Sequence, residues 1–489
     1  MNPTWRPKNG LSGDVNPFFW KGEYHAFYLE SSGISDPVLR FRTMWAHLVS
    51  SDLIHWDEYP IALKPGPKGS PDGTAIWTGS VIEHDGLFHI FYTGYNREDL
   101  FHSQTICHAT SKDLVKWEKD QNNPVLKADP NKYETHDWRD PKVFWNKQTN
   151  KFCMLLTARR KIGSEPFIKR GCIVLATSED LFHWRVDSDF WCPNLCFCHE
   201  CPDIFQWDNK WYLIWSKFAK PMGTFYRIAD DLRGPWHTPP ADRLDGKYLY
   251  AIRTAGDNFR RLAFGWVPTR LGEWDVGYWE WGGDLAIPRE VVKNIDGTLG
   301  FKCPPEIIKN YTKFLPVNLN VHLGTWKKQE DSVIGDRVDG LGYCFVPFES
   351  DNFVFETSLT LKPGTANAGI LFKTELDFSQ GYMVRFDPVY RRVVIDHWPL
   401  PADIPWQSTV IPPGLPSNNE PSPLVEQPID ITYEQPIDCK IIISKSIIQV
   451  FVNEKVSLTY RVYKTTGIPI GLFVEGGSVQ FINLKLKEI

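Results

Sequence analysis

The sequence predicts an all-β protein, a five-bladed β-propeller followed by a C-terminal β-sandwich. A strand–turn–strand phrase recurs five times before residue 310, at steps of about 50 to 64 residues. A second phrase, typified by SSDLIHW, alternates with it, and after residue 310 both stop and irregularly spaced β-sequence takes over. Repeats of a few strands at such a period are typical of propeller blades, so five copies predict five blades.

Each copy of the first phrase has the signature of a β-hairpin, two strand-like runs around a polar turn with Gly, Asn or Asp. The predicted hairpins cover residues 18–28, 81–92, 143–156, 204–215 and 254–266. The second phrase stands at residues 50–56, 110–117, 177–184 and, more loosely, 229–236. We therefore expect the propeller at residues 1–310.

The remaining residues, 311–489, read as a β-sandwich, because many short strands are separated by turn signals. The expected strands lie at residues 352–361, 381–387, 391–398, 439–463 and 470–486. Residues 399–436 form an insertion with ten prolines, which can be neither a helix nor a central strand. We interpret the insertion as a long extended loop that covers a neighbouring domain or reaches a second subunit, which leaves a homodimer open.

Composition and charge narrow the ligand class. A formal net charge of -5 gives no electrostatic reason to expect nucleic acid or an anionic membrane as a partner, so we expect a neutral ligand. Aromatic residues make up 14% of the chain, including 21 Trp, which suits stacking on sugar rings but also core packing. No apolar run approaches the ~20 residues of a membrane span, and the first residues do not resemble a signal peptide. The expected location is cytoplasmic, with export left open if the natural chain is longer.

Ten cysteines occur without the spacing of a disulfide scaffold, so free thiols are expected. Four of them stand close together in WCPNLCFCHEC: Cys192, Cys196, Cys198 and Cys201. They could bind zinc, but their spacing is not that of a common zinc module. We prefer buried packing near a turn and predict no metal.

Carboxylates recur just before the first strand of several predicted blades. Asp14 precedes the first hairpin, Asp140 the third, and Glu200 and Asp203 the fourth. The first strand of a blade lines the central channel, so these acids are expected to converge at the axis. A buried carboxylate is costly without partners, which favours a functional role over turn capping or pairing with surface arginines.

Convergent carboxylates fit glycoside chemistry, in which two acids with different pKa values share the work. Arg139 is placed to be the basic neighbour that separates those pKa values. We interpret His136, Asp137 and His199, which lie beside these acids in the sequence, as supporting residues rather than catalysts.

Other pocket candidates follow from their position in the repeat. Trp77 and Ser80 occupy the second blade's axial position, Trp45 and His47 precede the first copy of the second phrase, and Trp281 and Asp284 lie in the last blade. The Trp rings are candidates for a sugar platform, with core packing between blades as the equal alternative.

Three motifs together resemble the signatures of glycoside hydrolase family 32, the family of β-fructofuranosidases, levanases and inulinases. They are Asp14 before an aromatic hairpin, Arg139-Asp140-Pro141 in WRDPKVF, and Glu200-Cys201-Pro202 in HECPDIF. The resemblance continues in WAHLVSSDLIHWDEYPIAL, WTGSVI, WGGDLAIPREV and the sandwich segment IIQVFVNEKVSLTYRVY. It covers nearly the whole chain.

The resemblance implies a retaining enzyme that cleaves β-fructofuranosides such as sucrose, fructooligosaccharides, inulin or levan. It further implies that Asp14 is the nucleophile, Glu200 the general acid/base and Asp140 the residue that stabilises the transition state at the fructose hydroxyls. A covalent fructosyl-enzyme is expected, and no metal or organic cofactor.

The first motif departs from the family pattern. Asp14 is kept, but the Trp and Asn that usually precede it are replaced by Ser12 and Gly13. These neighbours normally shape the fructose pocket, so substrate choice and the balance of hydrolysis against transfer are open. Asn16 could supply a lost amide contact, although a turn role is preferred.

Other function classes remain as alternatives. A fructosyltransferase on the same scaffold, including one that forms difructose anhydrides, differs only in its acceptor site. A non-catalytic carbohydrate-binding propeller is disfavoured, because all three acids are kept. An inverting arabinanase-like propeller enzyme fits the Arg-Asp-Pro triplet, the Glu-Cys pair and the sandwich less well.

Overall fold

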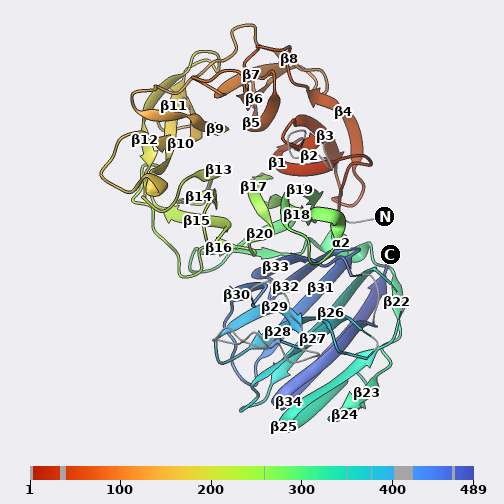
Figure 1. Cartoon of the computed structure of the whole chain (residues 1–489). Coiled ribbons are helices and arrows are strands. Elements are labelled where there is room, and N and C mark those ends of the chain that lie inside the picture. Colours follow the sequence, from red (N-terminus) through yellow and green to blue (C-terminus); the bar gives the residue numbers. More distant parts are fainter. Residues whose placement is uncertain are drawn as a thin grey trace, which may run out of the picture.

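A computed structural model describes residues 4–32, 40–257, 259–348, 350–375, 377–400, 422–464 and 468–489. The chain forms a β-propeller and a β-sandwich, drawn above and below one another in Figure 1. The short helix α2 (Pro305–Lys309) and two 3-10 turns, Phe167–Lys169 and Leu271–Glu273, lie between the strands. Over the described ranges, no helix is long and apolar enough to cross a membrane.

The propeller has five blades of antiparallel strands, in chain order. Blade I contains β1 (Leu11–Trp20), β2 (Glu23–Ser31), β3 (Met44–Ser50) and β4 (Asp57–Leu63), and blade II contains β5 (Ala75–His84), β6 (Leu87–Tyr95), β7 (Gln104–Ser111) and β8 (Glu118–Lys119). Blade III contains β9 (Tyr133–Asn146), β10 (Lys151–Arg160), β11 (Gly171–Ser178) and β12 (Arg185–Trp191), and blade IV contains β13 (His199–Trp207), β14 (Lys210–Lys217), β15 (Gly223–Ala229) and β16 (Arg243–Leu244). Blade V contains β17 (Tyr250–Gly256), β18 (Arg261–Arg270), β19 (Trp279–Leu285), β20 (Arg289–Lys293) and β21 (Leu299–Lys302). The fold class and the five hairpins predicted from the repeat are confirmed.

The first strands of the blades, β1, β5, β9, β13 and β17, form the innermost ring (Figure 1). Each of them contacts the first strand of the next blade, and β17 contacts β1, so the ring is closed. Any side chain that these strands turn toward the axis therefore meets side chains from other blades.

The second repeated phrase is a turn that connects the third and fourth strands of a blade. In blades I to III one carboxylate oxygen accepts hydrogen bonds from the backbone N–H groups two and three residues later; the acids are Asp52, Asp113 and Asp180. The Trp that ends each phrase donates its indole N–H to the carbonyl of the phrase's Leu. The conserved letters of this phrase thus build the turn, since an Asp side chain replaces the missing backbone acceptors.

The ring closes through the beginning of the chain. Trp5 and Leu285 exchange two backbone hydrogen bonds, of 3.1 and 2.8 Å, and β1 pairs with β19 at Ser12 and Gly283. The first and last blades are therefore joined by β-pairing, and a seam runs between residues at opposite ends of the propeller sequence.

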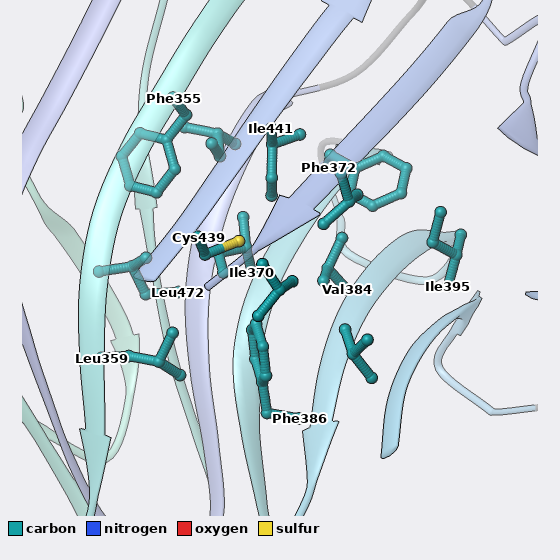
Figure 2. Packing of buried hydrophobic residues seen from close by; sticks show 14 of the residues in the cluster. Phe355, Leu359, Ile370, Phe372, Val384, Phe386, Ile395, Cys439, Ile441 and Leu472 are labelled. Carbon is teal, nitrogen blue, oxygen red and sulfur yellow. The ribbon is translucent and has the colours of Figure 1, made fainter. Parts of the chain in front are cut away.

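The sandwich is one hydrogen-bonded network that folds over itself. Its strands are β22 (Lys313–Leu315), β23 (Asn320–Leu323), β24 (Thr325–Gln329), β25 (Ser332–Val346), β26 (Asn352–Leu361), β27 (Asn367–Thr374), β28 (Gly381–Asp387), β29 (Arg392–Trp398), β30 (Val425–Pro428), β31 (Pro436–Ser444), β32 (Ile447–Val452), β33 (Val456–Arg461) and β34 (Ile468–Glu488). The long strand β34 pairs with β27 over its first part and with β26 over its second, which links the layers. Figure 2 shows the core between them, where side chains such as Phe355, Phe372 and Leu472 interdigitate.

The proline-rich insertion ends in an edge strand rather than a loop alone. Residues 401–421 of it lie outside the described residues. β30 pairs only with β29 among the described strands, at the end of the sheet, where a proline costs no ladder hydrogen bond. Gln427 of β30 donates to the carbonyls of Arg243 and Asp245 in the propeller, so this part of the insertion does contact a neighbouring domain.

The two domains meet at a buried polar cluster around Asp245, which follows β16. One oxygen of Asp245 accepts from the hydroxyls of Ser457 (2.5 Å) and Thr459 (3.1 Å) on β33. The guanidinium of Arg289 on β20, 1% exposed, lies 3.5 Å from the same oxygen. Because this cation is buried, its charge depends on the Asp245 carboxylate.

Replacing Asp245 by Ala is expected to lower the free energy of unfolding by about 3 to 5 kcal/mol, because it leaves the buried Arg289 charge without its partner. Denaturant or thermal unfolding monitored by circular dichroism measures the effect. The control is Asp230→Ala, which removes an exposed ion pair with Lys210 and should leave the unfolding transition unchanged. Equal transitions for the two variants would contradict the role given to the cluster.

Candidate active site

A β-bulge interrupts every innermost strand at an equivalent place. The pairing of these strands with their neighbours shifts register around Asp14, Thr78, Asp140, Cys201 and Ala251. A bulge redirects a side chain out of the regular alternation of a strand. Polar groups on the five strands can therefore gather at the axis while the strands beyond remain apolar, which explains why Arg139 and Asp140 stand directly before the core residue Val143.

Asp14 is held by two donors from other blades. Its Oδ2 accepts a 2.5 Å hydrogen bond from the Thr78 hydroxyl on β5, and its Oδ1 accepts a 2.7 Å bond from the indole N–H of Trp266 on β18. Both contacts fix the orientation of the carboxylate and favour its ionised form. Burial acts in the opposite direction and, as the largest effect, leaves the pKa of Asp14 raised.

Asp140 has a left-handed backbone conformation with φ of 59°. Its Oδ2 accepts from the Thr157 hydroxyl and from the backbone N–H of Cys201, each at 3.0 Å. The Cys201 thiol in turn lies 3.6 Å from Oδ2 of Asp14. Cys201 thus contacts both aspartates and brings blades I, III and IV to one point.

Glu200 precedes Cys201 and has two partners of its own. Arg139 donates to Oε1 at 2.9 Å, and the hydroxyl of Tyr250 on β17 donates to Oε2 at 2.6 Å. The Glu200 side chain is 17% exposed, so a ligand can reach it. Burial raises the pKa of Glu200, whereas Arg139 lowers it, and the net direction is upward. A carboxyl group of this kind can hold a proton in its resting state and release it.

Arg139 forms ion pairs with more than one of the acids at the site. It pairs with Asp137 at 3.0 Å as well as with Glu200, and Asp137 also binds Arg159. These anions keep the pKa of Arg139 well above its usual value despite burial. The structure therefore brings together Asp14, Arg139, Asp140 and Glu200, four of the five charged residues that the sequence assigned to the axis.

Asp203, the fifth charged candidate, has a different environment. It is fully buried, pairs with Lys142 at 2.6 Å, and accepts hydrogen bonds from the backbone and hydroxyl of Thr254. These partners come from β9 and β17, so Asp203 connects blades III, IV and V.

Several contacts at the site were not anticipated from the sequence: those of Thr78, Trp266, Tyr250 and Arg253. Arg253, 1% exposed, donates to the backbone carbonyls of Gly79 and Asp140 and so joins blades II, III and V beneath the carboxylates. Thr78 lies within the WTGS motif that was used for Trp77 and Ser80. Trp266 comes from a second strand of a blade, a position the repeat did not mark.

Four pocket candidates prove to be packing residues. Trp45 is fully buried and donates to the carbonyl of Trp77, so its ring has no face open to a sugar. Ser80 accepts a hydrogen bond from the backbone of Val143, and His47 pairs with His25. Asp284 forms a buried ion pair with Arg461 of the sandwich.

Asn16 is not a turn residue. It lies within β1, is 1% exposed, and its Oδ1 accepts a 2.9 Å hydrogen bond from the backbone N–H of Gly79. The side chain therefore braces blade I against blade II directly behind Asp14. The supporting residues behave similarly: His136 bonds to Ser103, and His199 is buried against Trp215.

Trp77 and Trp281 keep partly exposed rings and remain candidates for sugar contacts. Trp77 stacks on Tyr95 with ring centroids 4.2 Å apart. Trp281 packs against Phe41 (5.6 Å) and against Trp266 (5.7 Å), the indole that binds Asp14. The Trp281 ring therefore lies next to the indole that binds the Asp14 carboxylate.

The absence of a side chain at Gly13 allows the Trp281 ring to pack against the backbone next to Asp14. A β-carbon at residue 13 would lie 2.7 Å from Cη2 of the Trp281 ring and closer still to Cζ2, a separation that real atoms do not tolerate. The departure from the family motif and the position of Trp281 are therefore coupled: the ring occupies space that a larger residue at position 13 would need.

Replacing Gly13 by Asn, the residue usual in the family motif, is expected to lower kcat/KM by about 10- to 100-fold, because the displaced Trp281 disturbs Asp14 through Trp266. Combining it with Trp281→Ala removes the clash and should recover part of the loss. The comparison is made on kcat/KM of the single and double variants. If the double variant is no better than Gly13→Asn alone, the coupling is wrong.

The cysteine cluster of the sequence is divided in the structure. Cys196, Cys198 and Cys201 are buried, and the backbone N–H of Cys201 donates to the Asp140 carboxylate. Cys192 lies instead beside Cys172 and Asp189, the group among the described residues that places three possible metal ligands within 4.8 Å of one another. This group belongs to outer strands of blade III and not to the carboxylate site.

The fold and the site define a two-domain propeller protein in which three carboxyl groups and one guanidinium meet at the propeller axis. Residues 5–300 match the family described as Glycosyl hydrolases family 32 N-terminal domain. That match spans more than half of the chain, and the chain therefore belongs to the glycosyl hydrolases of family 32, which confirms the resemblance seen in the motifs.

Several relatives have the names of fructan-degrading enzymes. The chain is 28% identical to fructan 6-exohydrolase of Beta vulgaris over 324 residues, which cover 60% of this chain and 52% of that protein. It is 25% identical to the levanbiose-producing levanase of Bacillus subtilis (strain 168), in an alignment of length 526 that covers 99% of this chain and 89% of that protein. The chain spans about half the length of several of the curated relatives it matches. The crystal structure of exo-inulinase from Aspergillus awamori shares the fold, with a TM-score of 0.74 at 19% identity over 100% of this chain and 98% of that chain.

Proposed function

We propose that the protein hydrolyses β-fructofuranosidic bonds with retention of configuration, in sucrose, fructooligosaccharides, or inulin- and levan-type fructans. The family membership and the fructan-degrading relatives support the substrate class. One observation carries the mechanism: Asp14, Asp140 and Glu200 come from three different blades, yet two residues connect them. Cys201 contacts Asp14 and Asp140, and Arg139 contacts Asp140 and Glu200.

In the proposed reaction the Asp14 carboxylate attacks the anomeric carbon of fructose and forms an ester with it. Glu200 donates its proton to the glycosidic oxygen as that bond breaks. Water then attacks the fructosyl-enzyme, its proton passes to Glu200, and Asp14 leaves as a carboxylate. Asp140 accepts hydrogen bonds from the fructose hydroxyls.

The first chemical step requires one ionised and one protonated acid. Burial leaves the pKa of both Asp14 and Glu200 raised. Thr78 and Trp266 donate to Asp14, whereas Arg139 and Tyr250 donate to Glu200. The raised pKa of Glu200 supports its role as the acid that holds a proton, and the role of Asp14 as the ionised nucleophile follows the family resemblance.

Tyr250→Phe is expected to move the alkaline limb of the kcat/KM pH profile to higher pH. The Tyr250 hydroxyl donates to Glu200, stabilises its carboxylate and so lowers its pKa. Without this hydroxyl the pKa of Glu200 rises, and the proton needed for catalysis is retained to higher pH. The profile of the wild-type protein is the reference, and a limb that moves to lower pH would contradict the assignment of Glu200 as the acid.

The test of the proposed function is product analysis with sucrose, inulin oligosaccharides and levan as separate substrates. Release of fructose supports hydrolysis, and with methanol added, methyl β-fructofuranoside as the product supports retention. Oligosaccharides longer than the substrate, or difructose anhydrides, would assign the chain to transfer instead. Methyl α-fructofuranoside, or no reaction with any fructoside, would overturn the proposal.

A further inference from the structure

Two thiols and a carboxylate meet on the outer strands of blade III. Cys172 lies near the start of β11, Asp189 on β12, and Cys192 directly after β12. The pairing of Ile173 with Trp191 sets the two cysteines opposite one another across the two strands. One ligand atom of each of the three residues lies within 4.8 Å of the other two.

This donor set has a defined chemical preference. Two sulfur atoms and one carboxylate oxygen suit a thiophilic divalent cation such as Zn²⁺ and do not suit Mg²⁺ or Ca²⁺, which require oxygen ligands. Sulfur atoms bound to one tetrahedral zinc lie about 3.8 Å apart, so small side-chain rotations bring the three atoms into its coordination sphere.

The surroundings of Asp189 are those of a ligand. The Tyr133 hydroxyl donates a 2.6 Å hydrogen bond to its Oδ1, which orients the carboxylate and leaves Oδ2 to point elsewhere. Hydrogen bonds of this type hold metal-binding carboxylates in proteins. A cavity of about 440 Å³, lined by Asp189, Tyr133 and Asp129 among others, gives solvent access to this side of the cluster. A water molecule from it can fill the fourth coordination position.

We propose that Cys172, Asp189 and Cys192 bind one thiophilic divalent cation, with Zn²⁺ as its representative. The site is separate from the carboxylates at the axis and does not depend on the proposed function.

The charges nearby are compatible with a cation. Arg160 lies beside the thiols and is paired with Glu165 at 2.5 Å. The lining of the cavity holds the acids Asp129 and Asp187 together with the cations Lys132 and Arg160.

The experiment uses the full chain, reduced and freed of metal with a chelator, and titrates it with Zn²⁺ and separately with Cd²⁺. We expect one equivalent of metal per chain by elemental analysis after gel filtration, together with the ultraviolet absorption band of cadmium thiolate. Cys172→Ser and Asp189→Asn should each weaken binding at least about 10-fold, as loss of a ligand does.

The matched control is Cys153→Ser, which removes another buried thiol of the same blade, on β10, and should bind like the wild type. Asp189 is exposed, so Asp189→Asn tests the site even if Cys172→Ser does not fold. Failure of the wild type to bind one equivalent overturns the proposal. So does equal binding by Asp189→Asn and the wild type, or a Cys172–Cys192 disulfide that forms in place of metal uptake.

Discussion

Asp14→Asn is expected to lower kcat on a fructoside substrate by at least about 10⁴-fold while the protein remains folded. The amide keeps the size of the carboxylate: its oxygen can still accept from the Trp266 indole, and its NH2 group can donate to the Thr78 hydroxyl oxygen. It cannot attack the anomeric carbon to form the fructosyl ester. Fructose release followed by chromatography measures the loss, and circular dichroism shows that the fold is kept.

The control for this variant is Asp180→Asn, an acid of the repeated turn in the same propeller, which should lose turn stability but keep its kcat. A further test distinguishes the nucleophile from a supporting acid. Asp14→Ala leaves space for azide, and a nucleophile variant should then form fructosyl azide of inverted configuration. Wild-type turnover by Asp14→Asn would remove Asp14 from the mechanism.

Glu200→Gln is expected to lower kcat by about 10²- to 10⁴-fold on sucrose, whose leaving group must be protonated. On an aryl fructoside with an acidic phenol the loss in the fructosyl-transfer step should be far smaller, because that phenol leaves without a proton. Burst kinetics separate this step from the hydrolysis of the fructosyl-enzyme, which still needs Glu200 as a base.

The pH profile provides the second measurement on the same variant. The alkaline limb that reports loss of the Glu200 proton should disappear in Glu200→Gln, whereas the acid limb, set by ionisation of Asp14, should stay. The control is Glu179→Gln, an exposed acid paired with Lys151 at the edge of blade III, which should change neither limb. An equal loss on sucrose and on the aryl fructoside would argue against Glu200 as the acid.

The architecture was predictable because it depends on repetition. Hairpins and turns recur with their residues in register, and the three acids were found because they stand near one point of that register: Asp14 and Asp140 lie within the shifted pairing of their strands, and Glu200 lies directly before it. What the period does not reveal is the bulge in each innermost strand. A bulge changes which of two adjacent side chains faces the axis, so Thr78 contacts Asp14 while its neighbours Trp77 and Ser80 have other surroundings.

The other site residues that the sequence did not predict correctly also depend on contacts that the repeat does not show. Trp266 and Arg253 reach the site from blade V, and such contacts depend on how blades meet rather than on any local pattern. Trp45, His47 and Asp284 have residue types that suit a pocket, but their side chains fill contacts between strands, blades and domains. Gly13 was visible as a departure, and only the packing of Trp281 gives that departure a physical meaning.

The seam between the first and last blades sets the order in which the molecule can become active. Asp14 belongs to the first blade of the propeller, but the indole that orients it is Trp266 of the last blade, and the strand that β1 joins is β19. The contact spans about 250 residues of chain, and such contacts form late because the intervening loop must close first. A chain with only the first four blades therefore carries all three acids and is expected to show no activity, because Asp14 lacks the Trp266 contact.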